Sequence, residues 1–195
     1  MLPPIVLAST SPYRRALLAR LRIPFEVAAP AIDEAALGNE TPDATARRLA
    51  LTKARTIAAR HADAIVIGSD QVADVDGEAL SKPGSHDAAL AQLERMQGRS
   101  IIFHTALAVV HRRQSISEID SIPTTVKFRQ LPRAALEAYL NAEQPYDCAG
   151  AAKIEALGIV LVESVASDDP TALIGLPLIR LTSMLAQCGV PLPPR

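Results

Sequence analysis

Cysteine is scarce in this sequence, with two residues, Cys148 and Cys188, in a chain of 195. Two thiols in a chain of this length do not form the disulfide framework of a small secreted protein, and their spacing is not that of a zinc site. Long apolar runs are absent as well, since none approaches the roughly 20 residues that a membrane-spanning helix needs. The short apolar run near the start follows no positively charged segment, which favours a strand over a signal peptide. We therefore expect a cytoplasmic protein with reduced thiols and no membrane partner.

An excess of positive charge is also lacking, because the formal net charge is −1. Without a global positive field the chain is a poor candidate for non-specific nucleic-acid binding, so we expect no nucleic-acid partner. The motifs GxxxxGK[ST], HExxH and GxSxG do not occur, which excludes a P-loop protein and gives no sign of a zincin or an α/β-hydrolase. The four histidines are scattered, and we assign none of them as a metal ligand. A local basic pocket for a small anion stays open.

The order of the expected elements favours an α/β fold. Each of the first two expected helices begins with a hydroxyl N-cap followed by proline, at Ser11-Pro12 and Thr41-Pro42. Asp76-Gly77 predicts a hairpin. Apolar patterning predicts strands over 5–8, 25–29, 64–68, 100–111, 115–129 and 158–165, and helices over 42–61, 85–96, 132–141 and, interrupted, 171–188. Long strands joined by hairpins indicate a mixed sheet. Because no repeat or linker occurs, we expect a single domain over 1–195, with two lobes around a cleft.

The turn from Ser9 to Arg15 is the first candidate site. It joins a strand to a helix and places Arg14 and Arg15 in the first helical turn. A helix N-terminus offers free N–H groups and a partial positive charge, and is therefore a natural seat for phosphate. The other interpretation is a plain capped helix with solvated arginines.

Acidic and basic side chains beside turns are the next candidates. Asp70 follows the apolar strand 64–68, where a carboxylate can hold a divalent metal or orient water, although a turn-forming aspartate fits too. Lys82, in a Pro-Gly turn, is a candidate phosphate contact or an exposed turn lysine. Glu34 is a candidate metal ligand or part of a solvated loop. Lys53 on the second helix is a candidate cation or a surface lysine.

Two later stretches combine small and charged residues. Cys148–Glu155 contains small residues that permit the close approach of a ligand, and Glu155 suits the N–H edge of a guanine-type base; an ordinary loop is the alternative. The pair Asp168-Asp169 precedes a helix, which it is expected to cap.

In their order along the chain, these segments resemble the Maf family of nucleotide pyrophosphatases. The resemblance runs from Leu7 to Leu178, through LASTSPYRRALL, IDE at 32–34, Lys53, IGSDQV at 67–72, SKP at 81–83 and IGLPL at 174–178. It implies a mixed, elongated α/β sheet like that of inosine triphosphate pyrophosphatases, with the nucleotide in a cleft between two lobes. It also implies hydrolysis between the α and β phosphates with Mg²⁺ or Mn²⁺.

The resemblance and the chemistry of the side chains together suggest roles for individual residues. The phosphates would contact Ser9 and four cations, namely Arg14, Arg15, Lys53 and Lys82. Asp70 would be the general base or a metal ligand, and Glu34 a second acidic ligand.

One branch of the family, which hydrolyses N7-methyl-GTP, resembles this chain more closely through Tyr13, Gln71, Glu155 and the stretch at 168–179. An aromatic ring suits a positively charged methylated base. Two departures from the pattern are Ser81, where glycine is common, and Ala151-Ala152 in place of a bulkier pair. A UTP/dTTP pyrophosphatase and a nucleotide-binding regulator of septum formation are the alternatives, and a homodimer is left open.

Overall fold

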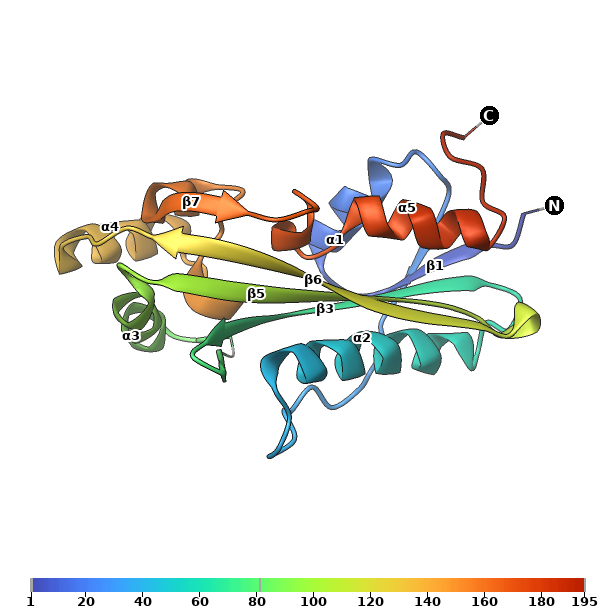
Figure 1. The fold of residues 1–195 in the computed structure, drawn as a ribbon, viewed down its shortest axis with the longest axis horizontal. Helices are drawn as coiled ribbons and strands as arrows, with labels where there is room; N and C mark the ends of the chain where they lie inside the picture. The colour runs from blue at the N-terminus through green and yellow to red at the C-terminus, as the bar shows by residue number, and fades with distance from the viewer. Residues whose placement is uncertain (1, 81, 195) are drawn as a thin grey trace.

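The computed structural model describes residues 2–80 and 82–194, and its centre is a seven-stranded sheet in the order β2-β1-β3-β5-β6-β7, with β4 paired to β3 (Figure 1). The strands are β1 (Ile5–Ala8), β2 (Glu26–Ala28), β3 (Ile65–Val75), β4 (Glu78–Leu80), β5 (Ser100–His111), β6 (Ile116–Phe128) and β7 (Val162–Ala166). The α-helices are α1 (Pro12–Ala19), α2 (Pro42–Ala58), α3 (His86–Met96), α4 (Arg133–Glu143) and α5 (Leu178–Gln187).

The sheet is mixed, which confirms the prediction. Strands β1, β2 and β3 are parallel, whereas β4, β5, β6 and β7 join by antiparallel pairing. The long strands β3, β5 and β6 run along the longest axis of the molecule (Figure 1). The predicted hairpin lies at Asp76-Gly77, where both residues have the positive φ values, 56° and 86°, that such a turn requires.

Helices cover both faces of the sheet at one end of the long strands. Figure 1 shows α2 below the sheet and α1 and α5 above it. The core between α2 and the sheet contains mostly alanine and valine, while leucine and isoleucine fill the space under α1 and α5. Small residues let α2 approach closely: a Cβ at Gly68 would lie 2.2 Å from the carbonyl oxygen of Ala50.

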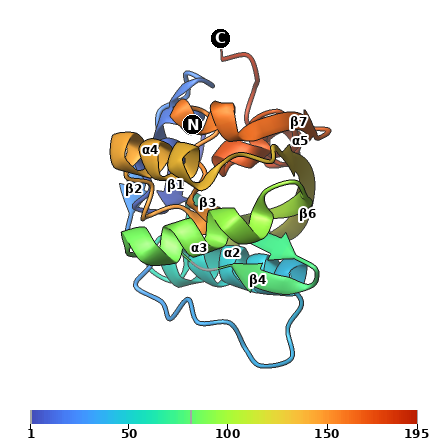
Figure 2. The same ribbon diagram turned by 90° about the vertical axis from the view of Figure 1, so that its left-hand side faces the viewer.

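A separate hydrophobic cluster lies at the other end of the long strands. It packs α3 and α4 against the ends of β3, β5 and β6 and against β7, and Phe103, Met96 and Leu140 are among its most buried side chains. Figure 2 views this end, with α3 and α4 toward the reader. The two lobes expected from the sequence are these two packed ends of one sheet.

Two expected boundaries were wrong. The strand expected at 64–68 extends to Val75, so Asp70 lies inside β3. Residues 157–161 form a 3₁₀ turn, because the Gly158 N–H turns back to the Lys153 carbonyl (2.9 Å), and β7 begins after it. The interruption expected within helix 171–188 is confirmed: a short 3₁₀ turn, η4 (Ala172–Ile174), ends at Gly175, whose φ is 116°, and α5 follows it. None of the helices in the described part of the chain combines the length and the apolar character of a membrane-spanning helix.

Candidate functional site

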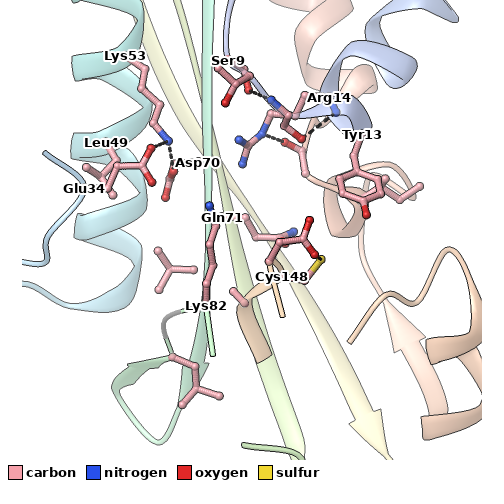
Figure 3. A pocket seen from close by; sticks show the side chains of 18 of the residues that line it. Ser9, Tyr13, Arg14, Glu34, Leu49, Lys53, Asp70, Gln71, Lys82 and Cys148 are labelled. Atoms are coloured by element: carbon pink, nitrogen blue, oxygen red, sulfur yellow. Dashed lines mark hydrogen bonds and ion pairs between the residues drawn. The ribbon is translucent and has the colours of Figure 1, made fainter. Parts of the chain in front are cut away.

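A cleft of about 660 Å³ opens beside the middle of β3, between the two packed ends of the molecule. Its walls come from the turn before α1, the loop before α2, α2 itself, β3, the β3–β4 hairpin, the segment after α4 and the turn η4 (Figure 3). Of the residues singled out in the sequence, it is lined by Ser9, Tyr13, Arg14, Glu34, Lys53, Asp70, Gln71, Lys82 and Glu155.

The cleft lies along an open stretch of the β3 edge. On this edge β1 pairs with residues 65–67 and β4 with residues 73–75. Between them, residues 68–72 have no strand partner on this side within the described part of the chain. Since neighbouring side chains on a strand point to opposite faces, Asp70 faces α2 while Gln71 faces α1 and η4. The open edge therefore lets one cleft reach groups on both faces of the sheet.

Lys53 joins the two candidate acidic residues. Its ammonium lies 2.6 Å from Oδ1 of Asp70 and 2.7 Å from Oε1 of Glu34 (Figure 3). The exposed fractions of the side chains are 5% for Lys53, 10% for Asp70 and 50% for Glu34. Burial opposes ionisation of Glu34, but the hydrogen bond and charge of Lys53, with the charges of Lys82 and Arg14, outweigh it and lower its pKa. The sequence signalled these charges but not that they form one bridge.

Arg14 is anchored by the turn that precedes α5. Its Nε–H donates to the carbonyl oxygen of Gly175 at 2.8 Å, which leaves the remaining guanidinium N–H groups directed into the cleft (Figure 3). Burial lowers the pKa of Arg14, and the negative charges of Asp70 and Glu34 oppose this. Ser11 caps the helix by accepting from the Arg14 N–H at 3.3 Å, as predicted from Ser11-Pro12.

Ser9 directly follows β1, in the turn that leads to Arg14. Its side chain is buried, and its Oγ accepts a hydrogen bond from the Ser11 N–H at 3.1 Å. The strand-to-helix turn therefore places a hydroxyl and the free N–H groups of a helix start on the same side of the cleft.

Gln71 holds the turn η4 in place. Its Nε2 donates to the carbonyls of Ala172 (3.1 Å) and Leu173 (2.9 Å) and to the hydroxyl of Thr105 (2.9 Å). Because the amide nitrogen is occupied, Oε1 is the atom that Gln71 can offer to a ligand. The sequence singled out Gln71 but gave no sign of Thr105, whose partners come from distant parts of the chain.

Asp169 fixes the other side of this turn. Its side chain is 2% exposed, and its carboxylate accepts from the N–H groups of Thr171 (3.0 Å) and Ile179 (2.7 Å). It therefore caps α5, as the acidic pair before the helix predicted. Sequence reasoning did not anticipate that Ser69, whose hydroxyl lies 2.9 Å from the Gly175 carbonyl, would tie β3 to the same turn.

Tyr13 and the segment after α4 form the end of the cleft that lies away from Lys53 and Glu34 (Figure 3). The Lys153 ammonium lies 6.0 Å from the centre of the Tyr13 ring, and Asp147, Cys148 and Glu155 line the wall beside it. Burial raises the pKa of Tyr13, of Cys148 to about 12, and of Glu155. The sequence analysis covered Lys153 only as a member of the stretch Cys148–Glu155 and gave it no role, and it did not single out Asp147.

Arg15 and Lys82 differ in their position relative to the cleft. Arg15 is exposed and lies in a shallow hollow between α1 and β2 with Phe25 and Val27, outside the cleft. Arg15 is the next residue after Arg14 on α1, and its side chain points to another face of the helix. The predicted phosphate contact of Arg15 is therefore not supported by its position. Lys82 lines the cleft from the hairpin, whereas Ser81 lies outside the described residues.

The carboxylates of Glu34 and Asp70 are the groups that can hold a divalent metal. Their oxygens are hard ligands, and Mg²⁺ commonly binds one or two carboxylates together with substrate phosphates and water. In the part of the chain that the structure describes, no group of three or more His, Cys, Asp or Glu side chains could hold a metal ion. The residues therefore fit a metal that also binds the ligand's phosphates.

Comparison with known proteins agrees with these observations. The family model described as Maf-like protein matches residues 4–188. Curated relatives cover nearly the whole chain. A 7-methyl-GTP pyrophosphatase of Albidiferax ferrireducens is 57% identical over 186 residues, which is 95% of this chain and 94% of the relative. Proteins with the same name from Cupriavidus metallidurans (58% over 189 residues; 97% and 95% of the two chains) and Thiobacillus denitrificans (59% over 188 residues; 96% and 94%) are similar.

Proposed function

Because the chain belongs to the Maf-like protein family, we propose that it is a metal-dependent pyrophosphatase that hydrolyses N7-methyl-GTP to N7-methyl-GMP and pyrophosphate. The observation that carries this proposal is the arrangement of charge in one cleft. Arg14, Lys53 and Lys82 provide positive charge around the carboxylates of Glu34 and Asp70. Tyr13 and the segment after α4, which includes Glu155, form a separate wall. A nucleoside triphosphate needs such cations for its phosphates and a separate surface for its base.

The phosphates bind at the end of the cleft that contains Arg14, Lys53 and Lys82. The Arg14 guanidinium, with its Nε held by Gly175, presents its other N–H groups in a fixed direction, and Ser9 and the helix start add hydrogen-bond donors. Lys82 reaches the same space from the hairpin. Charged donors in a partly buried cleft stabilise the negative charge that develops on the leaving pyrophosphate.

Asp70 is the residue that acts on the attacking water. Lys53 holds its Oδ1 at 2.6 Å and thereby fixes the carboxylate, so Oδ2 is the oxygen that can accept the proton of the water. The water oxygen bonds to the α-phosphorus, the bond from that phosphorus to the bridging oxygen breaks, and pyrophosphate leaves. Asp70 and Glu34 would also hold the divalent metal, which when bound offsets charge on the phosphate oxygens. The site agrees with either role of Asp70, general base or metal ligand.

The base lies against the wall formed by Tyr13 and the segment after α4. The Tyr13 ring offers a face to the purine, and the Glu155 carboxylate accepts N–H groups from the guanine edge. We also propose a cytoplasmic location, in keeping with the two free thiols, Cys148 and Cys188.

The experiment is an assay of the purified protein with Mg²⁺ or Mn²⁺ on N7-methyl-GTP, GTP, UTP and dTTP, measuring pyrophosphate and orthophosphate separately. We expect pyrophosphate, with N7-methyl-GTP preferred. Asp70→Asn should lower turnover by about 10²–10⁴-fold. Asp74→Asn is the matched control, because Asp74 lies on the same strand with its side chain 17% exposed and pairs with His104 away from the cleft lining.

The outcomes separate the alternatives. Release of orthophosphate alone would place the cleavage at another bond. A preference for UTP or dTTP would keep the pyrophosphatase reaction and reject the base assignment, and nucleotide binding without turnover would favour a regulator.

A further inference from the structure

The segment after α4 carries more negative charge than the guanine edge requires. Asp147 and Glu155 line the cleft, and Glu143 lies just behind them on α4. The cation among them is Lys153, whose ammonium lies 3.5 Å from Asp147 and 3.9 Å from Glu143. One lysine among three carboxylates leaves this end of the cleft negative, opposite in sign to the end that contains Arg14, Lys53 and Lys82.

The position of Lys153 limits what Tyr13 can do alone. The ammonium is 6.0 Å from the centre of the Tyr13 ring, at the outer limit of a cation–π contact. A positively charged base stacked on the same ring would compete with Lys153 for the negative potential of the ring face, and the lysine charge would repel it. The ring therefore gives a cationic base little advantage over a neutral one unless the lysine charge is offset.

Asp147 is placed to offset it. Its carboxylate pairs with Lys153, yet its side chain is 64% exposed and lines the cleft. Glu143 also pairs with Lys153, but its side chain is 20% exposed and it is not among the cleft-lining residues. Glu155 accepts from the guanine edge in the proposed function, and that edge presents the same N1–H and N2–H donors in methylated and plain guanine, so the number of hydrogen bonds does not separate the two bases.

We propose that Asp147 is a specificity-determining residue that offsets the charge of Lys153 and gives this wall the negative potential that favours a cationic, N7-alkylated purine over the neutral purine. The inference rests on the proposed function, because it needs a purine base at this end of the cleft. It predicts that any guanine nucleotide with a fixed positive charge on the ring, not the methyl group as such, is the preferred class.

The test is the ratio of kcat/KM for N7-methyl-GTP to that for GTP. A unit charge a few ångströms from another in a water-exposed site changes affinity by about fivefold, and Asp147→Asn also uncovers Lys153, so we expect the ratio to fall by about three- to tenfold. Lys153→Met removes the opposing charge and should raise the ratio. Asp63→Asn is the control, because Asp63 is 72% exposed and ion-paired with Arg113 but lies outside the cleft.

The ionic strength gives an independent measurement on the unmodified protein. If charge sets the preference, the ratio should fall as KCl rises from about 50 mM to about 0.5 M, because screening shortens the range of the interaction. A ratio that does not change with salt or in Asp147→Asn would overturn the inference. So would a fall of the ratio in both Asp147→Asn and Lys153→Met, which would mean that the pair only positions Tyr13.

Failure of the proposed function gives a different result. If the unmodified protein prefers UTP or dTTP, the base assignment fails and this inference fails with it. If the unmodified protein prefers N7-methyl-GTP and the Asp147→Asn ratio equals that of Asp63→Asn, the proposed function stands and only the role of Asp147 is rejected.

Discussion

Replacing Lys53 by methionine removes one positive charge from the centre of the cleft while keeping an unbranched side chain of similar length. The ammonium of Lys53 lies 2.6 Å from Asp70 and 2.7 Å from Glu34, and the lysine side chain is 5% exposed. The substitution therefore leaves the apolar packing of α2 largely in place and removes the partner of two carboxylates. We expect both a loss of stability and a loss of turnover.

The two carboxylates contribute unequally to the expected change. The Asp70 side chain is 10% exposed, and a charge-assisted hydrogen bond to such a group contributes about 1.5–3 kcal/mol. The Glu34 side chain is 50% exposed, and ion pairs of exposed groups contribute about 0–1 kcal/mol. Methionine avoids the desolvation of a buried ammonium, which offsets part of the loss. We expect the free energy of unfolding to fall by about 2–3 kcal/mol at pH 7.

The effect depends on pH in a direction that follows from Glu34. Its pKa in the folded protein is below the ordinary value of 4.5, although burial opposes this, because Lys53 and the neighbouring cations favour the carboxylate. A lowered pKa stabilises the fold above the ordinary value, and this stabilisation is lost as the pH falls through the lowered value. The difference between the wild type and Lys53→Met should therefore be largest near neutral pH and shrink below pH 4.5.

Urea unfolding followed by far-UV circular dichroism measures this difference. The matched control is Lys127→Met, because Lys127 also lies 2.7 Å from a carboxylate, that of Glu163, but both side chains are about half exposed. The control should lose less than about 1 kcal/mol. Equal losses in the two variants would refute the idea that Lys53 stabilises a buried bridge. A loss in Lys53→Met that does not shrink between pH 7 and about pH 3 would contradict the contribution assigned to Glu34.

Two further predictions concern the arginines and the sheet. Arg14→Ala should lower kcat/KM for nucleotide by about 10²-fold or more, whereas Arg15→Ala should change it by less than about threefold, because Arg15 lies outside the cleft; equal losses in steady-state assays would contradict this placement. Gly68→Ala should lower the free energy of unfolding by about 2–4 kcal/mol, because its Cβ would lie 2.2 Å from the Ala50 carbonyl. Gly38→Ala, with no atom within 4 Å of the added carbon, serves as its control in thermal unfolding.

Local signals in the sequence predicted much of the fold. Ser11-Pro12 and Thr41-Pro42 each place a capping hydroxyl before a proline that cannot donate a hydrogen bond, and both helices begin there. The strand expected over 100–111 has those bounds in the structure, because β-branched and apolar residues continue through it without a breaker. These features depend on neighbours a few residues away, which the sequence displays directly.

The errors arose where distant partners decide the backbone. The sequence predicted that the strand ends at Gly68 and allowed a turn-forming Asp70, but pairing with β5 keeps β3 extended through Asp70 to Val75. The apolar run at 158–165 suggested a strand, yet Gly158 folds back onto the Lys153 carbonyl, where a Cβ would lie 2.5 Å away. Neither the partner strand nor the carbonyl can be identified from the local pattern.

In the candidate site, too, the sequence indicated the residue types but not the contacts between residues that are distant in the chain. The sequence identified Glu34, Lys53 and Asp70 as chemically suitable residues, but it treated Lys53 as a phosphate ligand and not as the group that joins the two carboxylates. Arg14 and Arg15 looked alike as neighbours on one helix turn. The Gly175 carbonyl, 161 residues from Arg14, is what fixes one of them in the cleft.

The cleft lies where β1 ends. Asp70 itself lies in the middle of β3, which continues past the cleft. In an open α/β sheet, ligands bind beyond the carboxyl ends of parallel strands. Here the strand that ends is β1, at Ala8, whereas β3 continues because its other edge pairs with β5. The open edge beyond β1 opens the cleft to Asp70 on one face of β3 and to Gln71 on the other, so the side chain proposed to be catalytic and its supporting neighbour alternate along one extended segment. A rigid central strand holds these groups more precisely than a loop would, which suits a reaction that depends on positioning charge around a phosphate.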